Sequence, residues 1–327
     1  MKGLATVAIS GAMLLGAPWA QAATPQVTHL SRREIHVHDP STIVRCKDEY
    51  WVFFTGEGVP SAHSRDLVRW DSGPCVFTNL PAEVVQAVPA HKGNQAWAPD
   101  LIHLGNRYLL YYSVSTWGKN TSAIALATNP TLDPHDPQYR WTDQGVVIQS
   151  CDGNDFNTID PAISQDSRGG LWLAFGSYWS GIKLVALDPA TGKRPPHEDR
   201  MYSLARSDSI EASYIYHHGD FYYLFVDWGQ CCRGTNSTYS IRIGRSRNIT
   251  GPYVDRNRKD MLQGGGSLFL GTEGPFVGPG HAGIVSDGKA DWFSCHFYDG
   301  DRGGTPALGI GRVAWGDDEW PVLMPMK

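Results

Sequence analysis

The sequence Asp220-Phe-Tyr-Tyr-Leu-Phe-Val226 is one of five short segments in which aromatic and branched apolar residues follow one another almost without interruption. The other four are Glu49-Tyr-Trp-Val-Phe-Phe-Thr55, Arg107-Tyr-Leu-Leu-Tyr-Tyr-Ser113, Gly170-Leu-Trp-Leu-Ala-Phe-Gly176 and Asp291-Trp-Phe-Ser-Cys-His-Phe297. They recur at intervals of roughly 60 residues, and such a repeat indicates supersecondary units that bury their apolar faces only against their neighbours. The sequence therefore predicts five similar structural units.

Each aromatic segment has a further short apolar run before it and another after it. Around Asp220–Val226 these are Ala212–Tyr216 and Tyr239–Arg245, and runs bounded by Gly, Pro, Asn and Asp are typical of β-strands. A fourth strand is expected near Trp70, Trp141 and Trp320. No segment has the 3.6-residue apolar period of an amphipathic helix. Five units of three or four strands predict an all-β fold, the five-bladed β-propeller. A β-sandwich is the alternative, but it does not explain five similar units.

The first 22 residues predict a secretory signal peptide. They contain Lys2, an apolar centre, and Ala20-Gln-Ala22 as a small-residue cleavage site. Residues 23–327 are then expected to form a single propeller domain. Beyond residue 22, no apolar run reaches the roughly 20 residues that a membrane-spanning helix needs. We therefore expect a secreted or periplasmic protein without a membrane partner.

Charge and cysteine content narrow the possible partners. The formal net charge is -5, and no stretch of the chain is strongly basic. Nucleic acids and anionic membranes are therefore poor candidates. Six cysteines permit disulfides in an oxidising compartment, but their spacing does not give the pairing. The adjacent Cys231 and Cys232 are equally compatible with a vicinal disulfide and with two buried thiols.

The residues at the starts of the innermost strands converge on the axis of a propeller, so their chemistry indicates function. In chain order these positions hold Asp39, Asp100, Asp160, Glu211 and His281. One Asp-Pro pair is more often a turn or strand-start cap. Four carboxylates at matched positions repel one another, and catalysis or cation binding explains that cost. Asp39, Asp160 and Glu211 are the strongest candidates, whereas a local structural role is expected for Asp100.

Two working carboxyl groups in a secreted protein rich in aromatic residues predict glycoside hydrolysis. One carboxyl must donate a proton to the leaving oxygen, while the other activates water or attacks the sugar. A third carboxylate nearby can keep the pKa of the acid high by repulsion. The sequence has no Gly-x-Ser-x-Gly motif of serine hydrolases and no His-Glu-x-x-His zinc motif. It also has no phosphate-binding loop, and no organic cofactor is expected.

An ordered set of motifs lies in register over nearly all of residues 23–327. It includes Val37-His-Asp-Pro-Ser41, Trp97-Ala-Pro-Asp100, Ile159-Asp-Pro161, Ile210-Glu-Ala-Ser213, Trp228-Gly-Gln-Cys-Cys-Arg-Gly234 and Gly278-Pro-Gly-His281. This set resembles glycoside hydrolase family 43, and within it the arabinan endo-1,5-α-L-arabinosidases (endo-arabinanases). The resemblance implies a five-bladed propeller and inversion of the anomeric configuration. By position it implies that Asp39 is the general base, Glu211 the general acid, and Asp160 the residue that tunes the pKa of the acid and orients it.

The same resemblance implies a metal ion, usually calcium, in the channel beneath the active site. His281 matches its protein ligand, and water must supply most of the six to eight oxygens that calcium prefers. A buried histidine bonded to a carbonyl is the alternative. For the substrate, Trp97 is expected to stack on a flat sugar face, and Asn157 and Ser177 are candidates for hydrogen bonds to a furanose hydroxyl. Trp117 and Trp179 are left open.

These observations predict a monomeric enzyme that cleaves internal α-1,5-L-arabinofuranosidic bonds of arabinan, a polysaccharide of pectin side chains. An exo-acting α-L-arabinofuranosidase or a β-xylosidase of the same family is the first alternative, because it would use the same three carboxylates in a closed pocket. A non-catalytic carbohydrate-binding propeller is the second. The three carboxylates argue against it, since a binding protein has no need for a mutually repelling trio.

Overall fold

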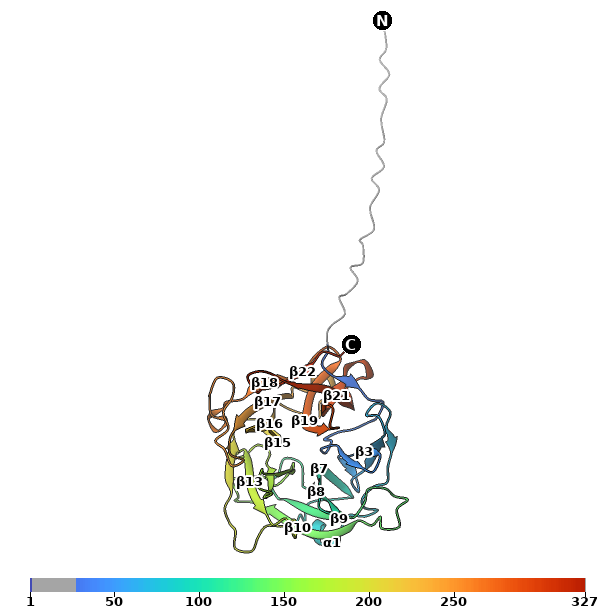
Figure 1. The fold of residues 1–327 in the computed structure, drawn as a ribbon, viewed down its shortest axis with the longest axis vertical. Coiled ribbons are helices and arrows are strands. Elements are labelled where there is room, and N and C mark those ends of the chain that lie inside the picture. The colour runs from blue at the N-terminus through green and yellow to red at the C-terminus, as the bar shows by residue number, and fades with distance from the viewer. Residues whose placement is uncertain (2–27, 327) are drawn as a thin grey trace.

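The computed structural model describes Met1 and residues 28–326. The predicted signal peptide, residues 1–22, lies outside the described residues except for Met1. Five antiparallel sheets stand around a central axis, and the first sheet lies beside the last (Figure 1). The fold is the predicted five-bladed β-propeller.

Each blade is a sheet of four or five strands. Blade 1 contains β2 (Val44–Cys46), β3 (Glu49–Phe53), β5 (Ser61–Ser64) and β6 (Asp71–Ser72), and blade 2 contains β7 (Gln95–Leu104), β8 (Arg107–Val114), β9 (Ser122–Asn129) and β10 (Thr142–Ser150), with β4 (Gly56–Glu57) on its inner edge. Blade 3 contains β11 (Ala162–Gln165), β12 (Leu171–Phe175), β13 (Ile182–Leu187) and β14 (Tyr202–Ala205), and blade 4 contains β15 (Ile210–His218), β16 (Phe221–Trp228), β17 (Ser240–Ser246) and β18 (Ser267–Leu270). Blade 5 contains β19 (Phe276–Ser286), β20 (Asp291–Asp299), β21 (Thr305–Trp315) and β22 (Pro321–Met324).

The two ends of the described chain meet in blade 5. Strand β1 (Ser31–Arg32) and strand β22 both pair with β21. The ring is therefore closed by backbone hydrogen bonds between the start and the end of the described residues. The predicted fourth strands near Trp70, Trp141 and Trp320 are confirmed as β6, β10 and β22. Within residues 28–326, helix is confined to α1 (Ala82–Gln86) and three 3₁₀ turns, Gly234–Asn236, Met261–Gln263 and Gly300–Arg302.

The aromatic segments form β3, β8, β12, β16 and β20. Each is the second strand of its blade in chain order when the short edge strands β1 and β4 are not counted. Tyr111 and Tyr112 in β8 are both fully buried, although consecutive side chains of a strand point to opposite faces. Both faces of the blade are therefore covered by neighbouring blades, which explains why these segments are apolar without alternation. Burying each large apolar side chain contributes about 1.5–3 kcal/mol, so the aromatic strands form the core.

Each inner strand is preceded or interrupted by a residue with left-handed backbone geometry. Asp39 has φ 48°, Ala98 43°, Asp160 57°, Ala212 51° and His281 60°. Such geometry costs about 1–3 kcal/mol for a residue other than glycine and is concentrated at functional sites. Each blade thus has one such residue at its inner strand.

In two blades the predicted carboxylate is offset from this left-handed residue. Asp100 follows the left-handed residue Ala98 by two positions, and Glu211 precedes Ala212 by one. β7 has a register shift between Trp97 and Asp100, and β15 has one between Glu211 and Tyr214. β19 has shifts on both sides of Gly280.

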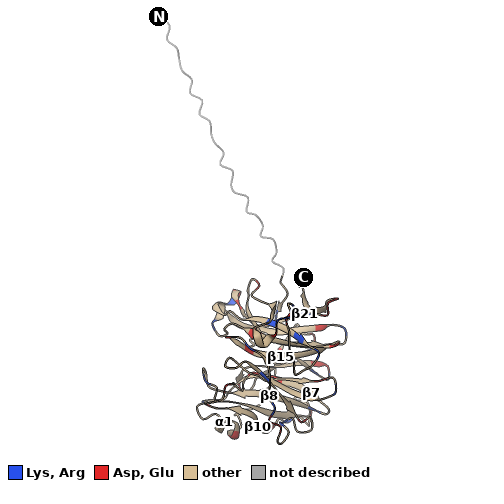
Figure 2. Ribbon diagram, turned by 90° about the vertical axis from the view of Figure 1, so that its left-hand side faces the viewer, with Lys and Arg blue, Asp and Glu red and all other residues tan. Residues whose placement is uncertain are grey.

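Acidic and basic residues are interspersed over the blades (Figure 2). No helix among the described residues is long and apolar enough to cross a membrane. Cys231 and Cys232 form a vicinal disulfide, and the other four cysteines, Cys46, Cys75, Cys151 and Cys295, are free.

Candidate active site

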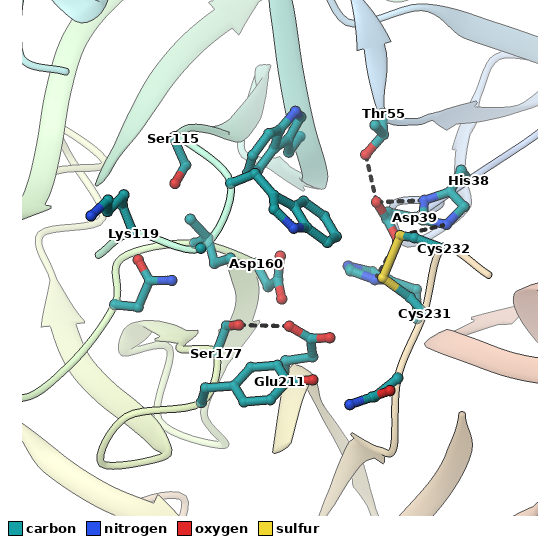
Figure 3. Close-up of a pocket in the computed structure, with 18 of the residues that line it drawn as sticks. His38, Asp39, Thr55, Ser115, Lys119, Asp160, Ser177, Glu211, Cys231 and Cys232 are labelled. Atoms are coloured by element: carbon teal, nitrogen blue, oxygen red, sulfur yellow. Dashed lines mark hydrogen bonds and ion pairs between the residues drawn. A yellow bond between two sulfur atoms is a disulfide. The ribbon is translucent and has the colours of Figure 1, made fainter. Parts of the chain in front are cut away.

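A cavity of about 780 Å³ is lined by residues from all five blades. Its walls include every residue predicted from the sequence to act in catalysis, substrate binding or metal binding: Asp39, Trp97, Asn157, Asp160, Ser177, Glu211 and His281. Figure 3 shows Asp39 and Glu211 on different walls, with Asp160 also turned toward the space between them. The repeat thus brings the predicted residues together although they are spread over most of the chain.

Asp39 lies in a ring of hydrogen-bond donors. Its Oδ2 accepts a hydrogen bond from Thr55 Oγ1 at 2.7 Å and lies 2.8 Å from Nδ1 of His38. Its Oδ1 lies 3.3 Å from Nδ1 of His281. Burial alone would raise the pKa of Asp39, but His38 and His281 outweigh burial and hold this pKa well below its usual range. Asp39 is therefore ionised at neutral pH, as a general base must be.

Asp160 and Glu211 have the opposite behaviour. Burial, followed by repulsion from Glu211, raises the pKa of Asp160 to about 8. Burial also raises the pKa of Glu211. The hydroxyl groups of Ser177 and Tyr239 donate to its two oxygens and lower this pKa, but burial outweighs them. Two interacting carboxyls of this kind release their protons as a pair. The pair retains a proton near neutral pH, which a general acid needs.

The predicted substrate-binding residues line the cavity, and two of them also make internal contacts. Ser177 Oγ donates to Oε2 of Glu211 at 2.6 Å, so this hydroxyl contacts the candidate acid directly. Asn157 Oδ1 accepts a hydrogen bond from Ser122 at 2.7 Å, which fixes the amide. The Trp97 ring packs edge-on against Trp117, with centroids 6.3 Å apart. These are contacts within the protein, so the roles of Trp97, Asn157 and Ser177 in substrate binding remain predictions.

His281 lines both the large cavity and a small one of about 10 Å³. Burial alone would lower the pKa of His281, but the carboxylates of Asp39, Asp160 and Asp227 outweigh it and raise this pKa to about 9. The small cavity is also lined by Asp100 and Ser213. Ser213 Oγ is buried and has no hydrogen-bond partner among the described residues, so it is an oxygen donor available to a guest in this cavity.

A second group of residues with metal-ligand chemistry lies beside Asp39. The ligand atoms of His38, Asp39 and His296 are all within 4.8 Å of one another. However, His296 Nδ1 accepts the backbone N–H of Asp39 at 3.2 Å, and His38 Nδ1 contacts the Asp39 carboxylate. The nitrogens nearest Asp39 are thus already engaged in hydrogen bonds, which fits an internal network better than a metal site.

The comparison with protein families identifies the chain. The sequence profile of the glycosyl hydrolases family 43 matches residues 34–321. The chain belongs to glycosyl hydrolase family 43. It is 40% identical over 307 residues to an extracellular exo-α-(1→5)-L-arabinofuranosidase of Cellvibrio japonicus, which covers 89% of this chain and 87% of that protein. It is 36% identical over 320 residues to the extracellular endo-α-(1→5)-L-arabinanase 1 of Bacillus subtilis, with 95% of each chain covered.

Solved structures agree with this assignment. The α-L-arabinanase of Cellvibrio cellulosa, solved in complex with arabinohexaose, matches with a TM-score of 0.85 and 37% sequence identity. The match covers 89% of this chain and 96% of that chain. The resemblance to family 43 seen in the sequence motifs is therefore confirmed.

The family 43 site also contains residues that the sequence analysis missed. Thr55 ends an aromatic segment and holds Asp39, and Tyr239 donates to Oε1 of Glu211. Asp227, near the end of β16, is buried beside the site. Its Oδ2 accepts the backbone N–H of His281 at 2.8 Å. Burial holds the pKa of Asp227 well above its usual range. Thr55 is the last residue of its aromatic segment, and Asp227 directly follows the segment Asp220–Val226. This position at the end of the aromatic strands could have indicated both residues from the sequence.

Asp100 has the structural role expected from the sequence. Its Oδ1 accepts the backbone N–H of Thr42 at 2.8 Å, and its Oδ2 accepts that of Ile163 at 2.7 Å. Thr42 and Ile163 each lie three residues after a catalytic candidate, Asp39 and Asp160. One buried carboxylate in blade 2 thus joins blade 1 to blade 3 directly behind the site.

Proposed function

We propose that this protein hydrolyses internal α-1,5-L-arabinofuranosidic bonds of arabinan by an inverting, single-displacement mechanism. The observation that carries the proposal is the pair of opposite protonation states in one cavity. The pKa of Asp39 is held well below its usual range, whereas the pKa of Glu211 is raised. When their environments shift the pKa values of two carboxyl groups in opposite directions, the group with the lowered pKa is assigned as the base and the group with the raised pKa as the acid.

In the proposed mechanism, the Asp39 carboxylate removes a proton from a water molecule as that water attacks the anomeric carbon. At the same time Glu211 donates its proton to the departing glycosidic oxygen, so the bond to the leaving sugar breaks without a charged leaving group. We assign the one proton that this pair retains to Glu211, where repulsion from an ionised Asp160 holds it. The attacking water needs room between the carboxyls, so we expect a separation of about 6.5 to 9.5 Å between Asp39 and Glu211.

The cavity supports an oligosaccharide as the ligand. Its volume of about 780 Å³ lies within the range of roughly 300–1,000 Å³ found for drug-sized ligands, so it exceeds what one pentose requires. Trp97 offers an aromatic face for stacking, and the rings of Trp117 and Trp179 are 73% and 42% exposed. The names of both relatives specify α-(1→5)-linked arabinose, which supports arabinan as the substrate.

An exo-acting arabinofuranosidase is the second candidate, because the relative from Cellvibrio japonicus has that activity in its name. Digestion of linear arabinan distinguishes the two if product sizes are followed from the first minutes. A ladder of oligosaccharides indicates endo cleavage, whereas one short product from the start indicates exo or processive action. A protein that binds arabinan without releasing any product would instead be the carbohydrate-binding propeller. Proton NMR of the first product reports its anomer, and retention of configuration would contradict the inverting mechanism.

We also propose that His281 binds a structural cation, with calcium as the first candidate. The imidazole nitrogen that does not face Asp39 and the unpartnered Ser213 Oγ are the available donors at the small cavity. Its volume of about 10 Å³ is near the space of one water molecule, so a water-coordinated ion requires the cavity to widen. Because the pKa of His281 is raised to about 9, the ion must displace the proton of this ring when it binds, and the bound ion would stabilise the junction of the inner strands.

Secretion or a periplasmic location is part of the proposal. It is supported by the signal-peptide pattern in residues 1–22 and by the extracellular relatives. N-terminal sequencing of the protein recovered from the culture medium and from the periplasm tests both the cleavage after Ala22 and the location. A monomeric state is likewise proposed, and light scattering measures it.

A further inference from the structure

Both ring nitrogens of His38 make hydrogen bonds. Nδ1 lies 2.8 Å from Oδ2 of Asp39, and Nε2 lies 2.8 Å from the hydroxyl oxygen of Tyr298. The His38 ring also stacks on His296, with centroids 4.3 Å apart and an interplanar angle of 20°. The imidazole next to the candidate base is therefore held at both ends and on one face.

Tyr298 in turn contacts the vicinal disulfide. Its hydroxyl oxygen accepts the backbone N–H of Cys232 at 2.7 Å, and Sγ of Cys232 lies 3.9 Å from Nε2 of His38. Cys232 has φ 67°, and Cys231 and Cys232 line the cavity wall beside His38 (Figure 3). Tyr298 itself is 1% exposed, so it is almost completely buried.

The chemistry of these groups gives the hydrogen bonds one direction. A carboxylate only accepts, so Nδ1 of His38 carries the proton that binds Asp39. In the neutral ring, Nε2 then accepts the hydroxyl proton of Tyr298, and the oxygen of Tyr298 accepts the N–H of Cys232. The tautomer of a histidine is set by such a partner on its second nitrogen. The result is a continuous chain from the backbone of Cys232 through Tyr298 and His38 to Asp39.

We propose that Tyr298 and His38 are positioning residues for Asp39, and that the Cys231–Cys232 turn is their anchor. The inference rests on the proposed role of Asp39 as the general base. Asp39 is also faced by Thr55, which donates to the same Oδ2, and by His281 and His296 near Oδ1. His38 and Thr55 together fix Oδ2 and hence the rotation of the carboxylate. A misplacement of about 1 Å can cost roughly 10²-fold in rate, so this rotation matters for the attack of water.

Steady-state kinetics on linear arabinan test the chain. Tyr298→Phe keeps the ring but removes the hydroxyl, and we expect kcat to fall roughly 10-fold while KM changes less than about twofold. His38→Ala is expected to lower kcat further. His38→Asn is expected to recover part of that loss, because its amide N–H can replace Nδ1 as donor to Asp39. Since Asn cannot reach Tyr298, adding Tyr298→Phe to His38→Asn should have no further effect. An equal loss in both backgrounds would overturn the proposal.

The matched control is Tyr111→Phe. The Tyr111 hydroxyl is buried and donates to the carbonyl of Gly192 at 2.7 Å, away from Asp39. This variant loses one buried hydrogen bond as Tyr298→Phe does, and it should leave kcat unchanged. A kcat loss in the control equal to that in Tyr298→Phe would assign both effects to general destabilisation and contradict the proposal.

Reduction tests the anchor. All six cysteines are among the described residues, and only Cys231 and Cys232 are paired, so a phosphine reductant has this one disulfide to cleave. We expect it to lower kcat of the wild type toward the value of Tyr298→Phe and to leave Tyr298→Phe unchanged. A rise in KM with unchanged kcat would place the turn in substrate binding and overturn its role as anchor.

A spectroscopic readout separates this inference from the proposed function. With ring-labelled histidine, long-range ¹⁵N–¹H spectra should show His38 as the Nδ1–H tautomer in the wild type and a mixture of tautomers in Tyr298→Phe. Identical His38 spectra in the two proteins would contradict the chain. If the wild type releases no product from arabinan, the proposed function fails, yet the spectra still decide whether Tyr298 controls His38.

Discussion

The backbone N–H of Ala212 donates to Oδ2 of Asp160, and the two atoms are 3.2 Å apart. Ala212 directly follows Glu211 in β15, so the candidate tuning residue of blade 3 is bonded to the backbone that carries the candidate acid of blade 4. Asp160 therefore contacts the acid in two ways, through the charge of its carboxyl and through this hydrogen bond. The side chain whose pKa is raised by Glu211 thus also binds the backbone beside Glu211.

Replacing Asp160 by Asn is expected to shift the pH dependence of activity. The general acid must be protonated, so kcat/KM falls as pH rises through the raised pKa of Glu211. Repulsion from Glu211 raises the pKa of Asp160. An ionised Asp160 should in turn oppose the ionisation of Glu211, and Asn removes this repulsion. The alkaline limb of the kcat/KM profile should therefore move to lower pH, with kcat at the optimum reduced roughly 10-fold to 100-fold. An unmoved alkaline limb would show that Asp160 does not tune the acid.

Replacing either working carboxyl should abolish hydrolysis while the protein stays folded. We expect Glu211→Gln and Asp39→Asn, or the corresponding Ala variants, to lower kcat on arabinan by roughly 10² to 10⁴-fold. An aryl glycoside with a good leaving group separates the roles, because its departure needs little proton donation. Glu211→Gln should recover much of its rate on that substrate, whereas Asp39→Asn should not. Equal recovery in both would reject the assignment, and circular dichroism checks the fold.

Trp97 is expected to contribute mainly to binding. Trp97→Ala removes the aromatic face and should raise KM for arabino-oligosaccharides roughly 10-fold, equivalent to about 1.4 kcal/mol. Trp97→Phe keeps a smaller ring and should have an intermediate effect. The kcat values of both should stay within about threefold of the wild type. An unchanged KM in Trp97→Ala would remove Trp97 from the substrate site.

The blade junction at Asp100 should be important for stability. Asp100→Ala leaves the N–H groups of Thr42 and Ile163 without their acceptor, and we expect the free energy of unfolding to fall by about 3 kcal/mol. Urea denaturation measures this loss. Asp48→Ala is the control, because its side chain is 97% exposed, and a change within about 0.5 kcal/mol is expected. Equal small effects in the two variants would show that the junction is not held by Asp100.

Removal of a bound cation is expected to lower thermal stability. Treatment of the purified protein with a chelator should lower Tm, and added calcium should restore it, because a ligand that binds only the folded state stabilises it by mass action. His281→Ala should lower Tm and make it insensitive to the chelator. A wild-type Tm that does not respond to chelator or calcium, with no metal found by mass spectrometry, would reject the cation.

Much of this architecture could be predicted because its signal is local and repeated. The aromatic segment encodes a strand buried on both faces, and its recurrence gave the number of blades and the core. The positions of Asp39 and Asp160 followed from the same repeat, since each precedes a proline at the start of an inner strand. The offset of Asp100 and Glu211 from the left-handed residues of their blades did not follow, because a register shift inside a strand leaves no mark in the residue pattern.

The sequence by itself determined the fold class, the family and the identity of the catalytic candidates, because these depend on residue types that recur at fixed places in each unit. Only the tertiary structure decided the partners of those residues and their protonation. His38 and Tyr298 are separated by 260 positions in the chain, and they meet because the last blade closes against the first. The opposite pKa shifts of Asp39 and Glu211 arise from contacts of this kind, since burial and neighbouring charges exist only once the five blades have closed around the axis.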